Sequence, residues 1–144
     1  MTLLLTFEAV HAGRLTMDTA VPVSEHAYHM GGSQIWLEPG EQFTLDEMLK
    51  AICVSSANDA AVAVAELVGG SEPAFVQQMN AKAAELGCTG TNFTCAHGLF
   101  DYGNVSTAQD LAKIAAACAE NQTFAQVAGT ASYVLPATNL RKAF

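Results

Sequence analysis

The sequence predicts a mainly α-helical protein with minor β structure. Apolar side chains recur at intervals of three and four residues in several separate segments, as they do along the buried face of an α-helix. Polar residues that cap helices stand before most of these segments, and glycines follow them. Runs that favour a β-strand are short and few. We therefore expect one helix-rich unit with a small β element, without internal repeats or linkers.

The first helix is expected at the start of the chain. Leu3, Leu4, Phe7 and Val10 recur at helical spacing, and Gly13 ends the segment. No capping residue stands before the first turn, so this helix looks cut partway along.

A small antiparallel ribbon is expected next. Residues 20–23 and 42–44 are short β-compatible runs that could pair around the irregular stretch between them. Gly31-Gly32 and Pro39-Gly40 supply turns, and the second pair has Pro and Gly in the order that a type II turn requires.

Three helices are predicted in the middle of the chain. Thr44 and Glu47 form a capping box that opens the first of them. The second covers residues 58–68 and is followed by a glycine pair, and Gly87 stops the third. The expected inward-facing residues are Leu45, Met48, Leu49 and Ile52, then Ala61, Val64, Ala65 and Val68, then Phe75, Met79, Ala83 and Leu86.

The last third of the chain predicts a loop, a helix and a strand. Residues 88–105 are rich in Gly, Asn and Thr, as loops are. Ser106 and Gln109 suggest another capping box, and residues 133–135 before Pro136 favour a short strand. The inward face of the helix is expected to be Leu111, Ile114, Ala115 and Cys118.

Composition and charge narrow the classes of partner. Hydrophobic residues make up 51% of the 144 residues, which is typical of a globular domain with a real core. With 14 acidic and 6 basic residues the formal charge is −8, which argues against nucleic acid or an anionic membrane as a partner. The first residues lack the basic start and cleavage site of a signal peptide, and no apolar run approaches the ~20 residues of a membrane span.

The cysteines indicate no metal site. They lack Cys-x-x-Cys spacing, so we expect neither a metal nor a cofactor. Cys53 and Cys118 fall on apolar helical faces, where a thiol packs as a small hydrophobic group. Cys88 and Cys95 flank a turn and could pair.

The strongest candidate for chemistry is Ser56-Ala57-Asn58, a polar cluster between two apolar runs. It falls at a predicted loop-to-helix junction, where a hydroxyl and a carboxamide could both point into a cleft. Ser56 and Asp59 also fit a capping box, in which the hydroxyl accepts a backbone N–H at the helix start. The two interpretations are compatible, because a helix start holds a side chain rigidly.

The histidines permit weaker interpretations. His97, next to Gly98, could form a catalytic triad with Ser56 and Asp101, although a His in such a loop is more often structural or solvated. His26 and His29 stand at helical spacing, a weak metal signal, and are most simply surface residues. The segment 31–33 lacks the Lys and the strand-to-helix frame of a phosphate-binding loop.

Five ordered segments together resemble one enzyme family, the low-molecular-mass penicillin-binding proteins that are serine-type D-alanyl-D-alanine carboxypeptidases. The segments are Met30-Gly31-Gly32-Ser33-Gln34, Leu37-Glu38-Pro39-Gly40, Ser56-Ala57-Asn58-Asp59-Ala60, His97-Gly98-Leu99 and Ser106-Thr107-Ala108-Gln109-Asp110-Leu111-Ala112. The resemblance covers essentially the whole chain. It implies that residues 1–144 are a single partial domain, the central helical lobe of a β-lactamase/transpeptidase-like fold.

The resemblance also implies a mechanism. In such enzymes a Ser of a Ser-x-x-Lys motif attacks the terminal amide of a peptidoglycan stem peptide ending in D-Ala-D-Ala, and β-lactams acylate the same Ser. Ser56 would be the catalytic proton relay of the second motif, and Asn58 would bind the substrate amide. The location implied is extracytoplasmic, at the cell envelope.

The departures from the family pattern limit what this polypeptide is expected to do. No Ser-x-x-Lys and no Lys-Thr-Gly occur in it, and Asn104 stands where relatives often have His. We therefore expect a truncated, catalytically incompetent chain that penicillin does not acylate, with an uncovered apolar face that favours self-association. The alternatives are a non-catalytic binding or scaffolding module and a β-lactamase relative; segments 30–33 and 97–99 favour the carboxypeptidase over the latter.

Overall fold

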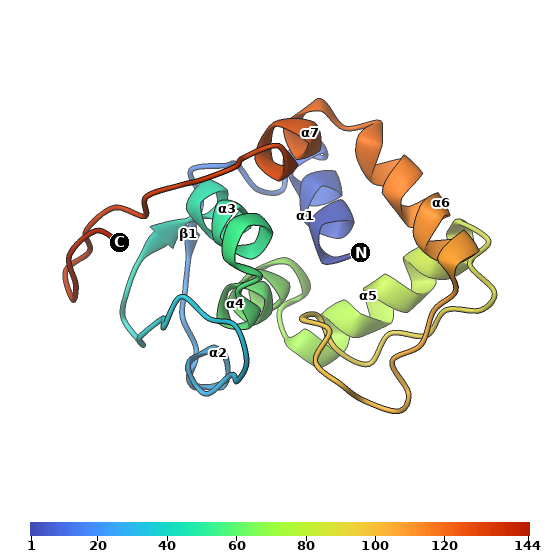
Figure 1. The fold of residues 1–144 in the computed structure, drawn as a ribbon, viewed down its shortest axis with the longest axis horizontal. Coiled ribbons are helices and arrows are strands. Elements are labelled where there is room, and N and C mark those ends of the chain that lie inside the picture. The colour runs from blue at the N-terminus through green and yellow to red at the C-terminus, as the bar shows by residue number, and fades with distance from the viewer.

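The computed structural model describes residues 1–144 as a ring of helices around a central one, with a two-stranded ribbon at one side. The elements are α1 (Thr2–His11), β1 (Ala20–Val21), α2 (Glu25–Tyr28), β2 (Phe43–Thr44), α3 (Leu45–Ser55), α4 (Asn58–Gly69), α5 (Glu72–Glu85), α6 (Ala108–Ala119) and α7 (Gln122–Ala128). In Figure 1, α1 lies in the middle, and it contacts α4, α5, α6 and α7. The prediction of a mainly α structure with minor β is confirmed.

The ribbon and its turn agree with the sequence, although the strands are shorter than expected. β1 pairs antiparallel with β2, with Ala20 opposite Thr44 and Val21 opposite Phe43. The turn that precedes β2 is closed by the amide of Glu41, which donates to the carbonyl of Glu38 at 3.0 Å. Gly40, with φ +86°, supplies the left-handed residue that a type II turn needs.

Helix α3 begins as predicted. The Thr44 hydroxyl accepts a hydrogen bond from the amide of Glu47, and the Glu47 carboxylate accepts one from the amide of Thr44. This reciprocal pair satisfies two N–H groups that a helix start otherwise leaves without partners.

Helix α4 lies deepest in the molecule. Every residue from Asn58 to Ala65 is buried, because α4 contacts α1, α2, α3 and α5. The largest apolar cluster joins α4 to Phe7, Phe43 and Leu49, among others. The small side chains of α4 let its neighbours approach on all sides, so a helix surrounded by others needs no polar face.

Helix α6 corrects the prediction in two ways. Its N-cap is Thr107, one residue later than expected, and the hydroxyl of Thr107 accepts from the amide of Asp110. Asp110 sets this register, because its carboxylate also accepts from the Gly90 amide and the Thr91 hydroxyl. Ser106 instead shares a hydrogen bond with Thr91.

The predicted inward face of α6 is half wrong. Ile114 and Cys118 are buried against Leu4, but Leu111 is 53% exposed and Ala115 is also exposed. The helix stands at the edge of the ring and packs mainly against α1, α7 and the end of α5 with the turn that follows it, so only a narrow stripe of it is covered.

Two short helices escaped the sequence analysis. In α2 the Ser24 hydroxyl caps the helix by accepting from the Ala27 amide, and in α7 the Asn121 carboxamide accepts from the Phe124 amide. Phe124 lies edge-on to Phe7, with the ring centroids 6.0 Å apart. Helix α7 therefore closes the ring over α1.

The predicted strand at residues 133–135 is absent. Leu135 and Phe144 exchange two backbone hydrogen bonds across a tight terminal loop, which is too short a pairing for a sheet. Arg141 anchors this tail through an ion pair with the buried Glu41 and a hydrogen bond to the Ile35 carbonyl. Burial tends to raise the pKa of Glu41, but the hydrogen bonds and charge of Arg141 outweigh it and leave that pKa below its usual value. No helix in the structure has both the length and the apolar character needed to cross a membrane.

Candidate active site

Ser56 lies at the sharp turn between α3 and α4. It follows the last residue of α3 in a left-handed conformation, with φ 55° and ψ 39°, and its side chain is exposed. Ala57 is the N-cap of α4 and makes no side-chain capping bond. The prediction that Ser56 caps this helix is therefore wrong: the backbone reverses at Ser56, which turns its hydroxyl away from the amides of α4.

Asn58, the first residue of α4, is held by the turn at residues 31–33. Its backbone amide donates to the Ser33 carbonyl, and its Nδ2 donates to the Gly31 carbonyl, both at 2.8 Å. The turn approaches so closely that a Cβ on Gly32 would lie 2.6 Å from Asn58 Nδ2. Oδ1 accepts no hydrogen bond from the protein and is not buried, so it is available to an external donor.

Asp59 binds residues 35–37 to the start of α4 and also accepts from an amide of its own helix. Its fully buried carboxylate accepts from the amides of Ile35 (3.2 Å), Leu37 (3.0 Å) and Ala60 (2.9 Å). Between the first two lies Trp36, with φ 59° and an indole that is 69% exposed. A left-handed conformation is unfavourable for a bulky residue, and the bonds to Asp59 keep it in place. Sequence reasoning missed this role because an Asp near a helix start looks like a cap.

Trp36 and Ser56 are the only non-glycine residues with positive φ in the chain. Both stand next to hydrogen bonds made by Asn58 or Asp59. Strained backbone of this kind gathers at functional sites, where the surrounding contacts support it. The start of α4 and the segment that it binds thus carry two exposed residues with left-handed backbone, Ser56 and Trp36.

His97 does not belong to a triad with Ser56. Its ring faces Glu72, with Nε2 3.7 Å from Oε1, and its Nδ1 accepts from the Leu99 amide at 3.1 Å. Asp101 accepts from the Gly103 amide in its own turn. The triad interpretation is therefore wrong, because the loop places His97 against the start of α5 and not against the α3–α4 junction.

The other histidines and the cysteines form no metal site. His26 pairs with Glu72 and His29 pairs with Glu25, so the two histidines do not face a common site. No group of three or more His, Cys, Asp or Glu side chains has the geometry to hold a metal ion. All four cysteines are free, so the suggested Cys88–Cys95 pair is wrong.

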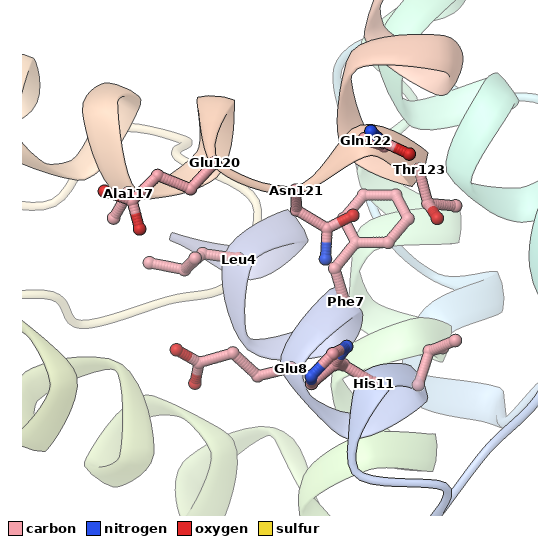
Figure 2. A pocket seen from close by; sticks show the side chains of 10 residues that line it. Leu4, Phe7, Glu8, His11, Ala117, Glu120, Asn121, Gln122 and Thr123 are labelled. Carbon is pink, nitrogen blue, oxygen red and sulfur yellow. The ribbon is translucent and has the colours of Figure 1, made fainter.

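A groove of about 690 Å³ lies away from Ser56. Figure 2 shows its lining side chains between α1 and the turn that joins α6 to α7. A smaller cavity of about 110 Å³ adjoins Ser55, under the terminal loop. The groove is lined by Leu4, Phe7, Glu8, Val10, His11, Ala117, Glu120, Asn121, Gln122 and Thr123.

Comparison with known proteins identifies the family. Residues 1–140 match the sequence profile of the family described as D-alanyl-D-alanine carboxypeptidase. The chain belongs to this family. Among individual relatives, it is 48% identical over 130 residues to the D-alanyl-D-alanine carboxypeptidase DacF of Bacillus subtilis, covering 90% of this chain and 33% of DacF. It is 35% identical over 118 residues to DacC of Escherichia coli, covering 78% of this chain and 30% of DacC.

Solved structures of the family share the fold. The D-alanyl-D-alanine carboxypeptidase DacD of Francisella tularensis superposes with a TM-score of 0.88 at 27% identity, over 99% of this chain and 35% of that one. The D-alanyl-D-alanine carboxypeptidase of Mycobacterium tuberculosis gives a TM-score of 0.83 at 30% identity, over 99% of this chain and 55% of that one. The expected helical, penicillin-binding-protein-like fold is thereby confirmed. The chain spans about a third of the length of the curated relatives it matches.

Proposed function

We propose that this chain forms the helical lobe of a serine-type D-alanyl-D-alanine carboxypeptidase, in which Ser56 relays a proton and Asn58 binds the substrate amide. The substrate class is peptidoglycan stem peptides ending in D-Ala-D-Ala, with β-lactams as acylating analogues, and the site of action is outside the cytoplasm. The observation that carries the proposal is the α3–α4 junction. An exposed hydroxyl there stands two residues from a carboxamide whose nitrogen is fixed and whose oxygen is available.

The geometry suits these two roles. Because Nδ2 of Asn58 is committed to the Gly31 carbonyl and Oδ1 has no partner within the chain, Oδ1 can accept the N–H of a peptide amide. Because Ser56 is fixed by its backbone conformation and does not cap α4, its hydroxyl can accept a proton and donate one in turn. Neither residue attacks the substrate carbonyl in this proposal.

The nucleophile is not among these residues. No serine of the 144 is followed three positions later by a lysine, and covalent catalysis needs the attacking atom itself. We expect the 144-residue polypeptide to remain unmodified when it is incubated with benzylpenicillin and followed by intact-mass spectrometry. A stoichiometric gain of one penicilloyl group would contradict this expectation.

A chimera tests the roles of Ser56 and Asn58. In B. subtilis DacF, the region that aligns with this chain would be replaced by residues 1–144, and acylation by a fluorescent penicillin would be measured together with D-Ala release. We expect the chimera to be acylated and Ser56→Ala to slow acylation about 100-fold or more, in the range of general acid–base catalysis. Asn58→Ala should raise the KM for the peptide substrate.

The matched control is Ser55→Ala, which removes an equally exposed hydroxyl one residue away. The acylation rate of this variant should stay within about twofold of the rate of the unsubstituted chimera, because a surface substitution outside the site changes little. A folded chimera that is not acylated, or equal rates for the Ser55 and Ser56 variants, would refute the assignment.

We also propose that the isolated chain self-associates. Leu111 is 53% exposed, Val134 70% and Leu140 49%, and the groove of Figure 2 leaves apolar side chains of α1 accessible. Exposed apolar surface of this kind favours association. Sedimentation velocity across a concentration series tests the proposal, and a monodisperse monomer throughout would contradict it.

A further inference from the structure

The buried carboxylate of Glu72 joins three segments of the chain. Its Oε2 lies 2.6 Å from His26 Nε2 in α2, and its Oε1 accepts from the Ala96 amide at 2.9 Å. Glu72 itself begins α5 and is only 8% exposed. The carbonyl of Ala96 is bound in turn by the Thr2 hydroxyl of α1, at 2.7 Å. The start of the 96–99 loop is thus held on both sides.

The hydrogen bonds of His97 define its tautomer. Because the Leu99 amide donates to Nδ1, that nitrogen carries no proton, and the single ring proton is on Nε2, directed towards Glu72. A second proton could bind only at Nδ1, where it would displace the Leu99 amide. Protonation of His97 at Nδ1 would therefore break the hydrogen bond that closes the 97–99 turn.

That turn reaches the proposed site through Gly32. A Cβ on Gly32 would lie 3.1 Å from Leu99 Cδ2 and 2.6 Å from Asn58 Nδ2, so the two side chains pack together on the same face of Gly32. Its neighbour Gly31 accepts the hydrogen bond that orients the Asn58 carboxamide. A shift of Leu99 would therefore remove a side chain that packs on Gly32 beside the Asn58 carboxamide.

We infer that Glu72 is a positioning residue for the proposed site: it fixes His97 and the 97–99 turn so that Leu99 packs beside the Asn58 carboxamide on the same face of Gly32. This inference rests on the proposed function of Asn58. Glu72 touches no substrate in it and acts only through the turn.

The charges around His97 predict in which direction its pKa should change when a neighbour is removed. Burial lowers the pKa of His97, the charge of Glu72 from α5 opposes that effect, and His26 from α2 adds to it. Removing the charge of Glu72 should therefore lower the pKa of His97 further, and removing His26 should raise it. Two variants with opposite expected signs separate this network from general destabilisation.

The test is an NMR titration of the ¹⁵N-labelled 144-residue chain between pH 8 and pH 4. We expect His97 to titrate below pH 6.5, and the Leu99 amide and the Asn58 side-chain NH₂ to shift with the same midpoint. Glu72→Gln should move this shared midpoint to lower pH, and His26→Gln should move it to higher pH. If the chain is oligomeric and too large for NMR, hydrogen exchange of residues 97–99, followed by mass spectrometry, measures how often the 97–99 turn opens at each pH.

The matched control is Glu25→Gln, which breaks an exposed His–Glu pair at His29. It should leave the shared midpoint unchanged. An Asn58 NH₂ signal that does not follow His97, or midpoints that move in the same direction in the Glu72 and His26 variants, would overturn the inference. The NMR and hydrogen-exchange measurements do not depend on acylation. Failure of the proposed function would be seen separately, because the DacF chimera without further substitutions would then not be acylated by penicillin.

Discussion

The α3–α4 junction and the groove beside α1 are held by different kinds of contact. At the junction, Asn58 and Asp59 bind backbone groups of residues 31–37, and Trp36 and Ser56 have left-handed conformations. In the groove, Leu4, Phe7 and Ala117 leave a space of about 690 Å³ with no such bonds across it. Hydrogen bonds to backbone specify single positions, whereas apolar packing specifies only volume. The junction should therefore be intolerant of small changes and the groove tolerant of large ones.

The largest effect should come from Asp59→Ala. The change leaves three amides, those of Ile35, Leu37 and Ala60, without their acceptor in a buried place. Each unsatisfied buried group costs about 1–3 kcal/mol, so we expect a loss of about 3 kcal/mol or more in the free energy of unfolding, measured by urea titration. Asp18→Ala, at an exposed Asp, is the control and should change stability by less than about 0.5 kcal/mol. Similar losses in the two variants would show that the buried bonds of Asp59 do not hold the junction.

Two glycine substitutions compare a tightly packed turn at the junction with an open turn elsewhere. Gly32 and Gly40 both have positive φ, but a Cβ on Gly32 meets Asn58 and Leu99, whereas one on Gly40 meets nothing within 4 Å. Gly40→Ala should cost about 1 kcal/mol from backbone strain alone. Gly32→Ala should cost about 1–3 kcal/mol more, because overpacking is added to the strain. Thermal unfolding measures the stability of both variants. Equal losses of stability in Gly32→Ala and Gly40→Ala would show that Asn58 is not held by close contact with the 31–33 turn.

The sequence predicted the helices that have long apolar repeats and missed those that lack them. α3, α4 and α5 follow from capping residues and periodicity, but α2 and α7 are too short to show a helical period. The site divides in the same way. Ser56 and Asn58 stand in a local motif, whereas the roles of Asp59 and Glu72 come from partners more than 20 residues away. A carboxylate near a helix start has the same local pattern whether it caps that helix or binds a distant loop.

The smallest effect should come from enlarging a side chain in the groove. Ala117 faces the groove from α6, so a leucine there can extend into open space, and Ala117→Leu should change the free energy of unfolding by no more than about 0.5 kcal/mol. Ala61→Leu makes the same substitution in the packed interior of α4, where the side chain is only 4% exposed. Forcing extra methylenes into such a site displaces neighbours and should cost about 1–3 kcal/mol. Urea titrations of the two variants, run beside the parent chain, measure the difference. A large loss of unfolding free energy in Ala117→Leu would mean that the groove is closed in solution. The groove would then tolerate substitutions no better than the junction.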